Sequence, residues 1–285
     1  MTEKVGRKGR GKIIALILLL GLVTVVLIHI VHALTLDRML EYKEISFYSP
    51  RVTAEMNGYK MAFVSDIHNM DEAGLREIVE ELNTRGIDLL ILGGDYPSDK
   101  EALRQAMEIL SQVHTTEGIF GVEGNHDRRS SLFAVMEEYN ITPLSNNGFY
   151  VHDNLYLCGV VDLWSGGADI SHATESARPE NFVLFISHNP DITMMQATDG
   201  IDLILSGHTH GGQITFFGFF APALLPDTIT DYGHRFISGW SESRDGIPVY
   251  ISNGVGTFPN VPRVFARPQV VLVTLHEGFQ LPLNG

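Results

Sequence analysis

The strongest constraint on the fold of this sequence is a series of apolar runs that end in glycine and polar residues. Five polar segments with metal-capable side chains occur in a fixed order: Asp66-x-His68, Gly94-Asp95, Gly124-Asn125-His126-Asp127, Ser187-His188 and Gly207-His208-Thr209-His210. Four of them directly follow a run of apolar or β-branched residues, the pattern expected of a buried strand. Because functional groups gather beyond the carboxyl ends of strands in α/β sheets, these side chains are predicted to share one cleft.

Helical patterns separate the expected strands. Asp71 is expected to cap a helix that has Leu75, Ile78 and Leu82 on one face and ends at Gly86. Two more helices are expected near 98–113 and 131–139. This alternation predicts an α/β fold with a largely parallel sheet covered on both faces. The expected strands are 61–65, 87–92, 118–122, 155–161, 182–186, 201–205, 248–252 and 269–275.

Residues 13–36 contain no Lys, Arg, Asp or Glu. A helix of this length spans the roughly 30 Å hydrocarbon core of a bilayer, so the segment is predicted to be a transmembrane anchor. A buried core helix and a cleaved signal peptide are the alternatives, and Val31-His32-Ala33 resembles a cleavage site. The uncleaved anchor is favoured because the apolar stretch exceeds the usual signal-peptide core. No function is assigned to His29 or His32 within it.

The distribution of charge predicts how the chain is oriented. Five Lys or Arg residues precede the apolar segment, whereas Arg38, Lys43 and Arg51 follow it over a similar length. The positive-inside rule therefore predicts a single-pass protein of the cell membrane with a cytoplasmic N-terminus and an extracytoplasmic body. Without residues 1–12, the chain carries 15 basic and 33 acidic side chains, a net charge of −18. Such a body is not expected to bind nucleic acid.

Asp95 and His210 carry the clearest chemical signals among the polar segments. Two glycines precede Asp95, which allows a metal to approach closely, and one carboxylate can bridge two cations through its two oxygens. Two imidazoles, His208 and His210, at the mouth of a buried strand would be energetically expensive without a ligand to coordinate. Asn125 offers a carbonyl ligand or serves as a turn residue. His188, taken alone, is more often a structural histidine.

The chemical types of the donors restrict the metal. Asp, His and Asn donors without a thiolate favour Mn²⁺, Fe or Zn²⁺ over Cu(I) or Ca²⁺. The single cysteine, Cys158, lies in an apolar stretch and is interpreted as a small core residue. The sequence therefore predicts a site for divalent cations and does not decide among these three metals.

Taken together, the five segments resemble the calcineurin-like metallophosphoesterase superfamily, in the family's order from Asp66 to at least His210. Residues 187–190, 207–213 and 253–256, together with Arg263, are similar to its membrane-anchored bacterial phosphodiesterase branch. The resemblance implies an α/β/β/α sandwich with an N-terminal transmembrane helix. The expected organisation is a basic cytoplasmic tail (1–12), the anchor (13–36), a juxtamembrane linker or strand (37–58) and a metallophosphoesterase domain (59–285).

The resemblance also implies a dinuclear centre in which a metal-bridging hydroxide cleaves a P–O bond. One metal would be held by Asp66, His68, Asp95 and His210, and the second by Asp95, Asn125, His188 and His208. His126 would be the acid near the leaving group, and Asp127 would orient or charge its ring. The residues after Asp95 depart from the family's usual pattern, so Asp99 receives no role.

The substrate is less constrained than the chemistry. A phosphoester is expected, with a lipid-linked one as an option, because the apolar segment 216–225 lies next to the predicted cleft. This segment is interpreted either as a hairpin packed on the core or as an apolar lip facing the bilayer. A phosphodiesterase is the first expectation. The alternatives are a lipid pyrophosphatase of the UDP-diacylglucosamine hydrolase type, a protein phosphatase and a non-catalytic metal-binding scaffold, and the oligomeric state stays open.

Overall fold

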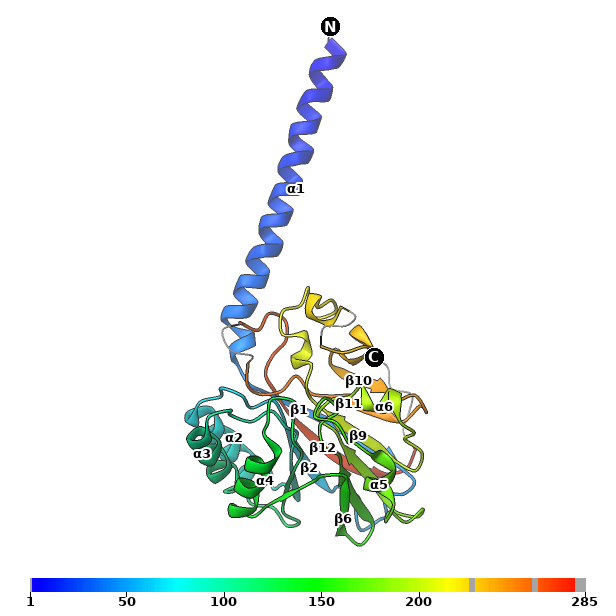
Figure 1. Ribbon diagram of the computed structural model, residues 1–285. Coiled ribbons are helices and arrows are strands. Elements are labelled where there is room, and N and C mark those ends of the chain that lie inside the picture. Colours follow the sequence, from blue (N-terminus) through cyan, green and yellow to red (C-terminus); the bar gives the residue numbers. More distant parts are fainter. Residues whose placement is uncertain (1, 226–228, 258–260, 280–285) are drawn as a thin grey trace.

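Two six-stranded sheets pack face to face in the computed structural model, which describes residues 2–225, 229–257 and 261–279 (Figure 1). Residues 280–285 of the predicted domain lie outside this range. The first sheet has the order β1 (Glu41–Ser49), β12 (Gln269–Glu277), β2 (Lys60–Val64), β3 (Leu89–Leu92), β4 (Ile119–Gly121) and β5 (Ile141–Pro143). The second has the order β10 (Gly239–Glu242), β11 (Pro248–Ile251), β9 (Leu203–Ser206), β8 (Phe182–Ile186), β7 (Leu155–Gly159) and β6 (Asn147–His152).

Both sheets are mixed. In the first sheet only β12 and β2 run antiparallel, whereas in the second the two edge pairs, β10 with β11 and β6 with β7, are antiparallel. The strands that precede the polar segments pair in parallel with one another within each sheet. Their carboxyl ends therefore point the same way.

Helices cover one outer face of each sheet. Three helices pack on the first sheet: α2 (Glu72–Arg85), α3 (Lys100–Leu110) and α4 (Arg129–Glu138). Two short helices, α5 (Ile170–Thr174) and α6 (Ile192–Met195), pack on the second, with the 3-10 turn η4 (Gly233–Phe236). The inner faces bury a common core in which Phe63 of β2 and Phe182 of β8 take part. The α/β/β/α sandwich implied by the resemblance is confirmed.

The single sheet expected from the alternation of strands and helices is wrong. In β8, Phe182 and Leu184 point into the core between the sheets, while Val183 and Phe185 pack beneath the helices. Both faces of the strand are buried, so its sequence is apolar throughout. A second sheet can cover one face of a strand just as a helix can. An apolar run in the sequence therefore does not show which of the two covers it.

The helix ends follow the sequence signals. The Asp71 side chain accepts a hydrogen bond from the Gly74 N–H at 2.8 Å, and Gly86 ends α2 with a φ of 63°. Asp99, for which no role was predicted, caps α3 by accepting the N–H groups of Glu101 and Ala102. This carboxylate is therefore used by the helix.

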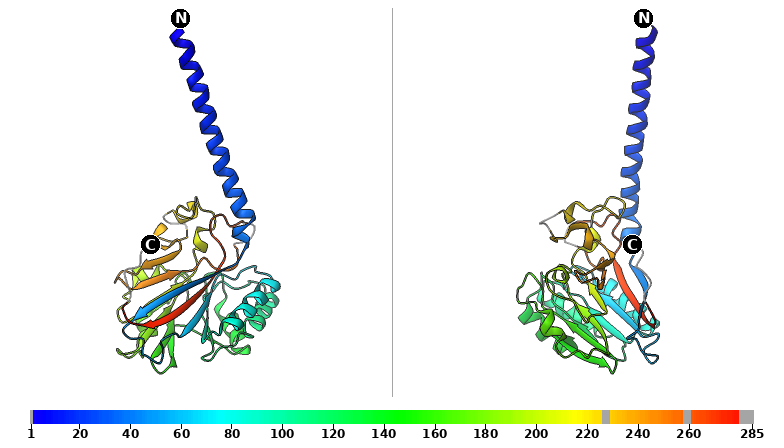
Figure 2. Two further views of the ribbon diagram at one scale, coloured as in Figure 1. Left: turned by 180° about the vertical axis from the view of Figure 1, so that it is seen from behind. Right: turned by 90° about the vertical axis from the view of Figure 1, so that its right-hand side faces the viewer.

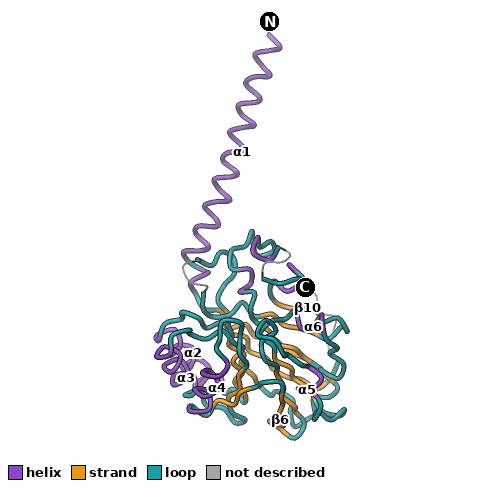
Figure 3. The backbone as a smooth tube through the Cα atoms, in the orientation of Figure 1, coloured by secondary structure: helices purple, strands orange, loops and turns teal. Residues whose placement is uncertain are grey.

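The N-terminal helix α1 (Thr2–Leu34) extends away from the body, as Figures 1 and 2 show. The stretch Arg10–Arg38, which begins in α1 and extends past its end, is long and apolar enough to cross a membrane, and its most apolar part is not buried by the body. The interpretation as a buried core helix is therefore wrong. Long loops occupy the end of the body from which α1 leaves, whereas β6 lies at the opposite end (Figure 3).

The last turns of α1 are fastened to the body by the two elements that follow it. In the 3-10 turn η1 (Leu36–Arg38), the Asp37 carboxylate accepts the backbone N–H groups of Phe265 and Ala266 at 2.8 and 3.0 Å. The same carboxylate lies 2.7 Å from His32 Nδ1, and the His32 ring stacks on Phe265 at 3.8 Å between centroids. Next, β1, within the segment expected as a linker or strand, pairs with β12 over its whole length. The helix is therefore docked at its end.

Packing predicts that Cys158 is chemically inert in the folded protein. The side chain is fully buried on β7, and burial raises the pKa of its thiol. We expect no reaction with a thiol-specific reagent near pH 8 and rapid reaction after denaturation. Prompt modification of the native protein at one site would show that the packing around β7 is looser than described.

Candidate metal centre

The seven predicted ligands lie in loops that leave strands of both sheets. Asp66 and His68 follow β2, Asp95 follows β3, Asn125 follows β4, His188 follows β8, and His208 and His210 follow β9. Three of these strands belong to the first sheet and two to the second. The site therefore forms where the carboxyl ends of two different sheets meet.

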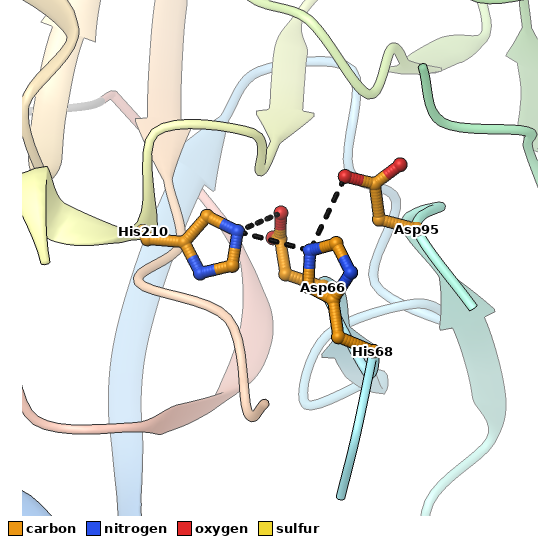
Figure 4. Close-up of side chains that lie close together, drawn as sticks. All are labelled: Asp66, His68, Asp95 and His210. Carbon is orange, nitrogen blue, oxygen red and sulfur yellow. Dashed lines mark hydrogen bonds and ion pairs between the residues drawn. The ribbon is translucent and has the colours of Figure 1, made fainter. Parts of the chain in front are cut away.

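Asp66, His68, Asp95 and His210 form one compact group of donors, shown in Figure 4. One ligand atom from each lies within 4.8 Å of all the others. His68 Nε2 is 3.1 Å from His210 Nε2 and 3.3 Å from Asp95 Oδ2, and His210 Nε2 is 3.4 Å from Asp66 Oδ1. The side chains point toward one another, as ligands of a common ion do.

A second group adjoins the first through Asp95. The Asp95 Oδ2 atom lies 3.3 Å from His188 Nε2, and His188 Nε2 lies 3.1 Å from Asn125 Oδ1. Asn125 Oδ1 is in turn 2.8 Å from His208 Nδ1. The structure thus brings the residues of both predicted ligand sets together around one carboxylate.

Asp95 presents a single oxygen to both groups. Oδ2 faces His68 and His188, while Oδ1 accepts the backbone N–H of His126 at 2.9 Å. From the sequence we expected each of the two Asp95 oxygens to bind one cation. The hydrogen bond from the loop occupies the other oxygen and leaves one oxygen to be shared.

Hydrogen bonds behind the rings fix which nitrogen faces the site. His188 Nδ1 lies 2.8 Å from the Gly93 carbonyl oxygen, so it donates and leaves the Nε2 lone pair toward Asp95. His208 Nε2 lies 2.9 Å from the Ile229 carbonyl oxygen, which leaves Nδ1 toward Asn125. Metal-ligating histidines in proteins are oriented in this way.

The electrostatics suit neutral imidazoles at three of the four histidines. Burial lowers the pKa of His208 and of His210 to about 3 and also lowers the pKa of His68. Burial would also lower the pKa of His188, but the Asp95 carboxylate beside it outweighs burial and raises this pKa. Burial alone would raise the pKa of Asp95, but the His188 and His68 rings outweigh it, and this pKa falls well below its usual range. Neutral imidazole nitrogens and a carboxylate are the forms that bind metal.

The ligand loops are held in an unfavourable backbone conformation. Of the ten non-glycine residues with positive φ in the described part of the chain, five are predicted ligands: Asp66, His68, Asp95, His208 and His210. Such conformations are uncommon and persist only where the surrounding structure imposes them, often at functional sites. The backbone therefore marks this site independently of the side chains.

Two glycines allow the loops to approach the carboxylates. A Cβ on Gly207 would overlap with Asp66 Oδ2, and a Cβ on Gly124 would overlap with Asp95 Oδ1. No side chain larger than hydrogen fits at either position without moving a candidate ligand. The glycines in these motifs are therefore explained by close packing.

His126 and Asp127 occupy different surroundings in the same loop. His126 is exposed at the rim, and its ring centroid is 5.5 Å from that of His68. The Asp127 carboxylate accepts the backbone N–H groups of Asp95, Tyr96 and Gly124 at 2.7 to 3.0 Å. Asp127 thus ties the two ligand loops together, and its predicted action on the His126 ring stays a prediction.

The comparison with known proteins identifies the family. The sequence pattern described as Calcineurin-like phosphoesterase matches residues 59–212. The chain belongs to this family. A transmembrane protein with metallophosphoesterase domain from Bos taurus is 29% identical over 254 residues, which are 80% of this chain and 55% of the relative. This chain therefore spans about half of the bovine relative's length.

Two bacterial relatives match over most of their length. Uncharacterized protein YpbG of Bacillus subtilis is 30% identical over 223 residues, 75% of this chain and 79% of that protein. Phosphodiesterase YaeI of Escherichia coli is 28% identical over 232 residues, 76% of this chain and 82% of that protein. Family membership suggests a metal-dependent phosphoester hydrolase, and the apolar α1 together with a relative named as transmembrane suggests membrane association.

The first donor group is a candidate metal site that fits a divalent cation. Its four donors are carboxylate oxygens and imidazole nitrogens, which suit Mn²⁺, Fe or Zn²⁺. The His68 and His210 nitrogens face each other at 3.1 Å with the carboxylates of Asp66 and Asp95 beside them. A cation placed among them would use all four donors.

No role was predicted for Arg263, whose hydrogen bonds hold the backbone next to the site. Its buried guanidinium donates to the His210 carbonyl at 3.2 Å and to the Ala266 carbonyl at 3.0 Å. It also donates to the carbonyls of Asn253, Gly254 and Gly256. The five N–H donors of a planar guanidinium are suited to binding several backbone carbonyls at once. The only signal was the resemblance in residues 253–256 and Arg263.

Trp164 was missed altogether. Its ring meets the His208 ring edge-on at 4.7 Å, and it lines a cavity of about 240 Å³ over the candidate ligands together with Ala223 and Ile229. This cavity has largely apolar walls beside the donors. Nothing in the sequence around Trp164 distinguishes it from an ordinary loop residue.

Removal of the shared carboxylate should empty the centre. We expect Asp95→Ala to lose bound metal, measured by elemental analysis of the purified protein, because both donor groups lose their common oxygen. Asp199→Ala, at an exposed loop position, is the matched control and should keep its metal. Full metal content in Asp95→Ala would show that Asp95 is not a ligand.

Proposed function

We propose that this protein is a membrane-anchored phosphodiesterase that depends on two divalent cations, Mn²⁺, Zn²⁺ or Fe. The observation that carries the proposal is Asp95 Oδ2, which lies 3.3 Å from His68 and 3.3 Å from His188, between two donor groups. The name of the relative YaeI supports a diester substrate. When bound, two cations at such a site supply Lewis acidity and an activated water.

The first ion would be held by Asp66, His68, Asp95 and His210, and the second by Asp95, Asn125, His188 and His208. The hydrogen bonds from His188 to Gly93 and from His208 to Ile229 hold these rings in place before any ion binds. Asp127 keeps the loops that carry Asp95 and Asn125 at a fixed separation. Preorganisation of this kind spares the reorganisation that a flexible site would need.

His126 is proposed to donate a proton to the leaving oxygen. Its side chain is exposed and lines the cavity over the donors, with its ring beside that of His68. Imidazole titrates near neutral pH and is the commonest general acid in enzymes. Trp164, Ala223 and Ile229 form an apolar wall of the same cavity.

Comparison of the wild-type protein with His126→Ala tests phosphodiester hydrolysis and the proposed role of His126 as the acid. The wild-type protein should hydrolyse bis-p-nitrophenyl phosphate with added Mn²⁺ and lose this activity after chelation. For a diester with a poor leaving group, the variant should turn over roughly 10²–10⁴-fold more slowly. The loss should be smaller for p-nitrophenolate, which leaves without a proton.

Metal content separates the possible outcomes. It should be unchanged in His126→Ala, and a fall in metal would make His126 a ligand. If the wild-type protein binds metal and hydrolyses no phosphoester, the fold serves here as a non-catalytic scaffold.

We further propose that α1 crosses the membrane once, with its N-terminus in the cytoplasm and the catalytic body outside. The five basic residues before the apolar stretch support this orientation. Glu80 is exposed on α2, so Glu80→Cys places a thiol on the body, while the native Cys158 is buried. A membrane-impermeant maleimide should label this variant in intact cells, and labelling only after permeabilisation would reverse the topology.

A further inference from the structure

Residues 214–220, here called the aromatic loop, leave four phenylalanines uncovered next to α1. Phe216, Phe217, Phe219 and Phe220 are 36–66% exposed, and Phe219 is the most exposed of them. The loop is a tight hairpin in which the Phe216 N–H donates to the Phe220 carbonyl at 2.7 Å. The four phenylalanines lie outside the core, so the interpretation of residues 216–225 as a hairpin packed on the core is wrong for them, although Thr215 and Ala221 are buried.

The aromatic loop is fixed against the anchor helix. The His29 ring of α1 contacts Phe216 and Phe217, with centroids 5.3 and 4.7 Å apart. The Thr215 N–H donates to the Val264 carbonyl at 2.9 Å, and the next residue, Phe265, is held by Asp37. The loop therefore has a defined position along the axis of α1.

This contact sets the depth of the loop relative to a bilayer. The helical part of the apolar stretch, residues 13–34, is about 33 Å long, close to the roughly 30 Å thickness of the hydrocarbon core. His29 lies five residues before the end of α1, about 8 Å along the axis. A loop that touches His29 therefore reaches the level of the bilayer boundary.

The composition and conformation of the loop suit that location. No charged residue occurs between Gly211 and Leu225 in the sequence. Phe217 and the neighbouring Phe265 both have a φ of 53°, which is rare for bulky residues. Exposed apolar patches of this kind mark protein–protein or membrane interaction sites, and phenylalanine occurs on the apolar face of segments that lie in the membrane interface.

A cavity beside the same turns of α1 has mainly apolar walls, although Asp37, Arg38 and Arg263 also line it. It has a volume of about 840 Å³ and lies between α1 and residues 261–264. Its walls include Ile30 and Leu34 of the helix and Val261, Pro262 and Val264 of the body. Lipid chains are the apolar material available at this depth.

We propose that the aromatic loop inserts into the lipid interface of the membrane that α1 crosses and gives the catalytic body a second membrane contact. This inference rests on the proposed insertion of α1. The aromatic loop leads directly into residues 221–225, in which Ala223 lines the cavity over the candidate metal ligands, as Ile229 does. Insertion therefore places that cavity beside the lipid surface, within reach of a phosphodiester in a headgroup.

Spin labels on the full-length protein test the inference. The variants Phe219→Cys, Leu27→Cys and Phe149→Cys, each of which adds one exposed cysteine, would be labelled and reconstituted into vesicles of phosphatidylethanolamine and phosphatidylglycerol. Leu27 is exposed on α1 and reports insertion of the helix, whereas Phe149, 39% exposed on β6 at the far end of the body, is the matched aromatic control. Cys158 is buried and should stay unlabelled.

Collision rates with oxygen and with a water-soluble nickel chelate measure the depth of each label. We expect the ratio of oxygen to nickel collisions at position 219 to be several-fold higher than at 149 and to approach that at 27. A lipid-exposed label at 27 with a water-exposed label at 219 would overturn the inference and leave the anchor intact. Low access of both reagents to the label at 219 would indicate a protein partner, such as a second copy, and would also overturn it. A water-exposed label at 27 would refute the anchor itself, and the inference with it.

Discussion

The shared position of Asp95 is the constraint on which the candidate centre depends. Its Oδ2 atom faces His68 on one side and His188 on the other, and these two histidines come from loops of different sheets. The two sheets must therefore pack in a defined register for the donors to meet. The buried core between the sheets, which includes Phe63 and Phe182, provides that register. The packing of the core therefore determines the geometry of the site.

Strain in the ligand loops is offset by the hydrogen bonds around them. Asp66, Asp95 and His208 all have positive φ, and each such residue costs on the order of 1–3 kcal/mol. Asp127 fastens the loops after β3 and β4, while Arg263 fastens the segments around His210 and residues 253–256. Asp127 and the buried Arg263 suit these roles because their hydrogen-bonding capacity is used. The hydrogen bonds of Asp127 and Arg263 hold the backbone of the loops, and this backbone positions the candidate ligands.

The helix α1 and the body are connected more closely than a flexible linker would allow. Asp37, in the turn η1 that follows α1, binds the loop at 265–266, and the Ala266 carbonyl accepts a hydrogen bond from Arg263, which also contacts the His210 carbonyl. Contacts therefore run from the helix to the back of the candidate centre. A body held in this way keeps the same end toward α1, as both views in Figure 2 show.

The sequence alone determined the local features: the apolar strands, the caps at Asp71 and Gly86, the apolar helix and the ordered donors. These depend on neighbouring residues, whose patterns are visible in the chain. Only the tertiary structure decided that two sheets supply the ligands, that Asp127 binds backbone amides, and that His32 and Asp37 dock the anchor. It also decided that the phenylalanines after Ile214 face outward. Such features arise from contacts between residues far apart in sequence, and an apolar run looks the same whether a helix, a second sheet or a membrane covers it.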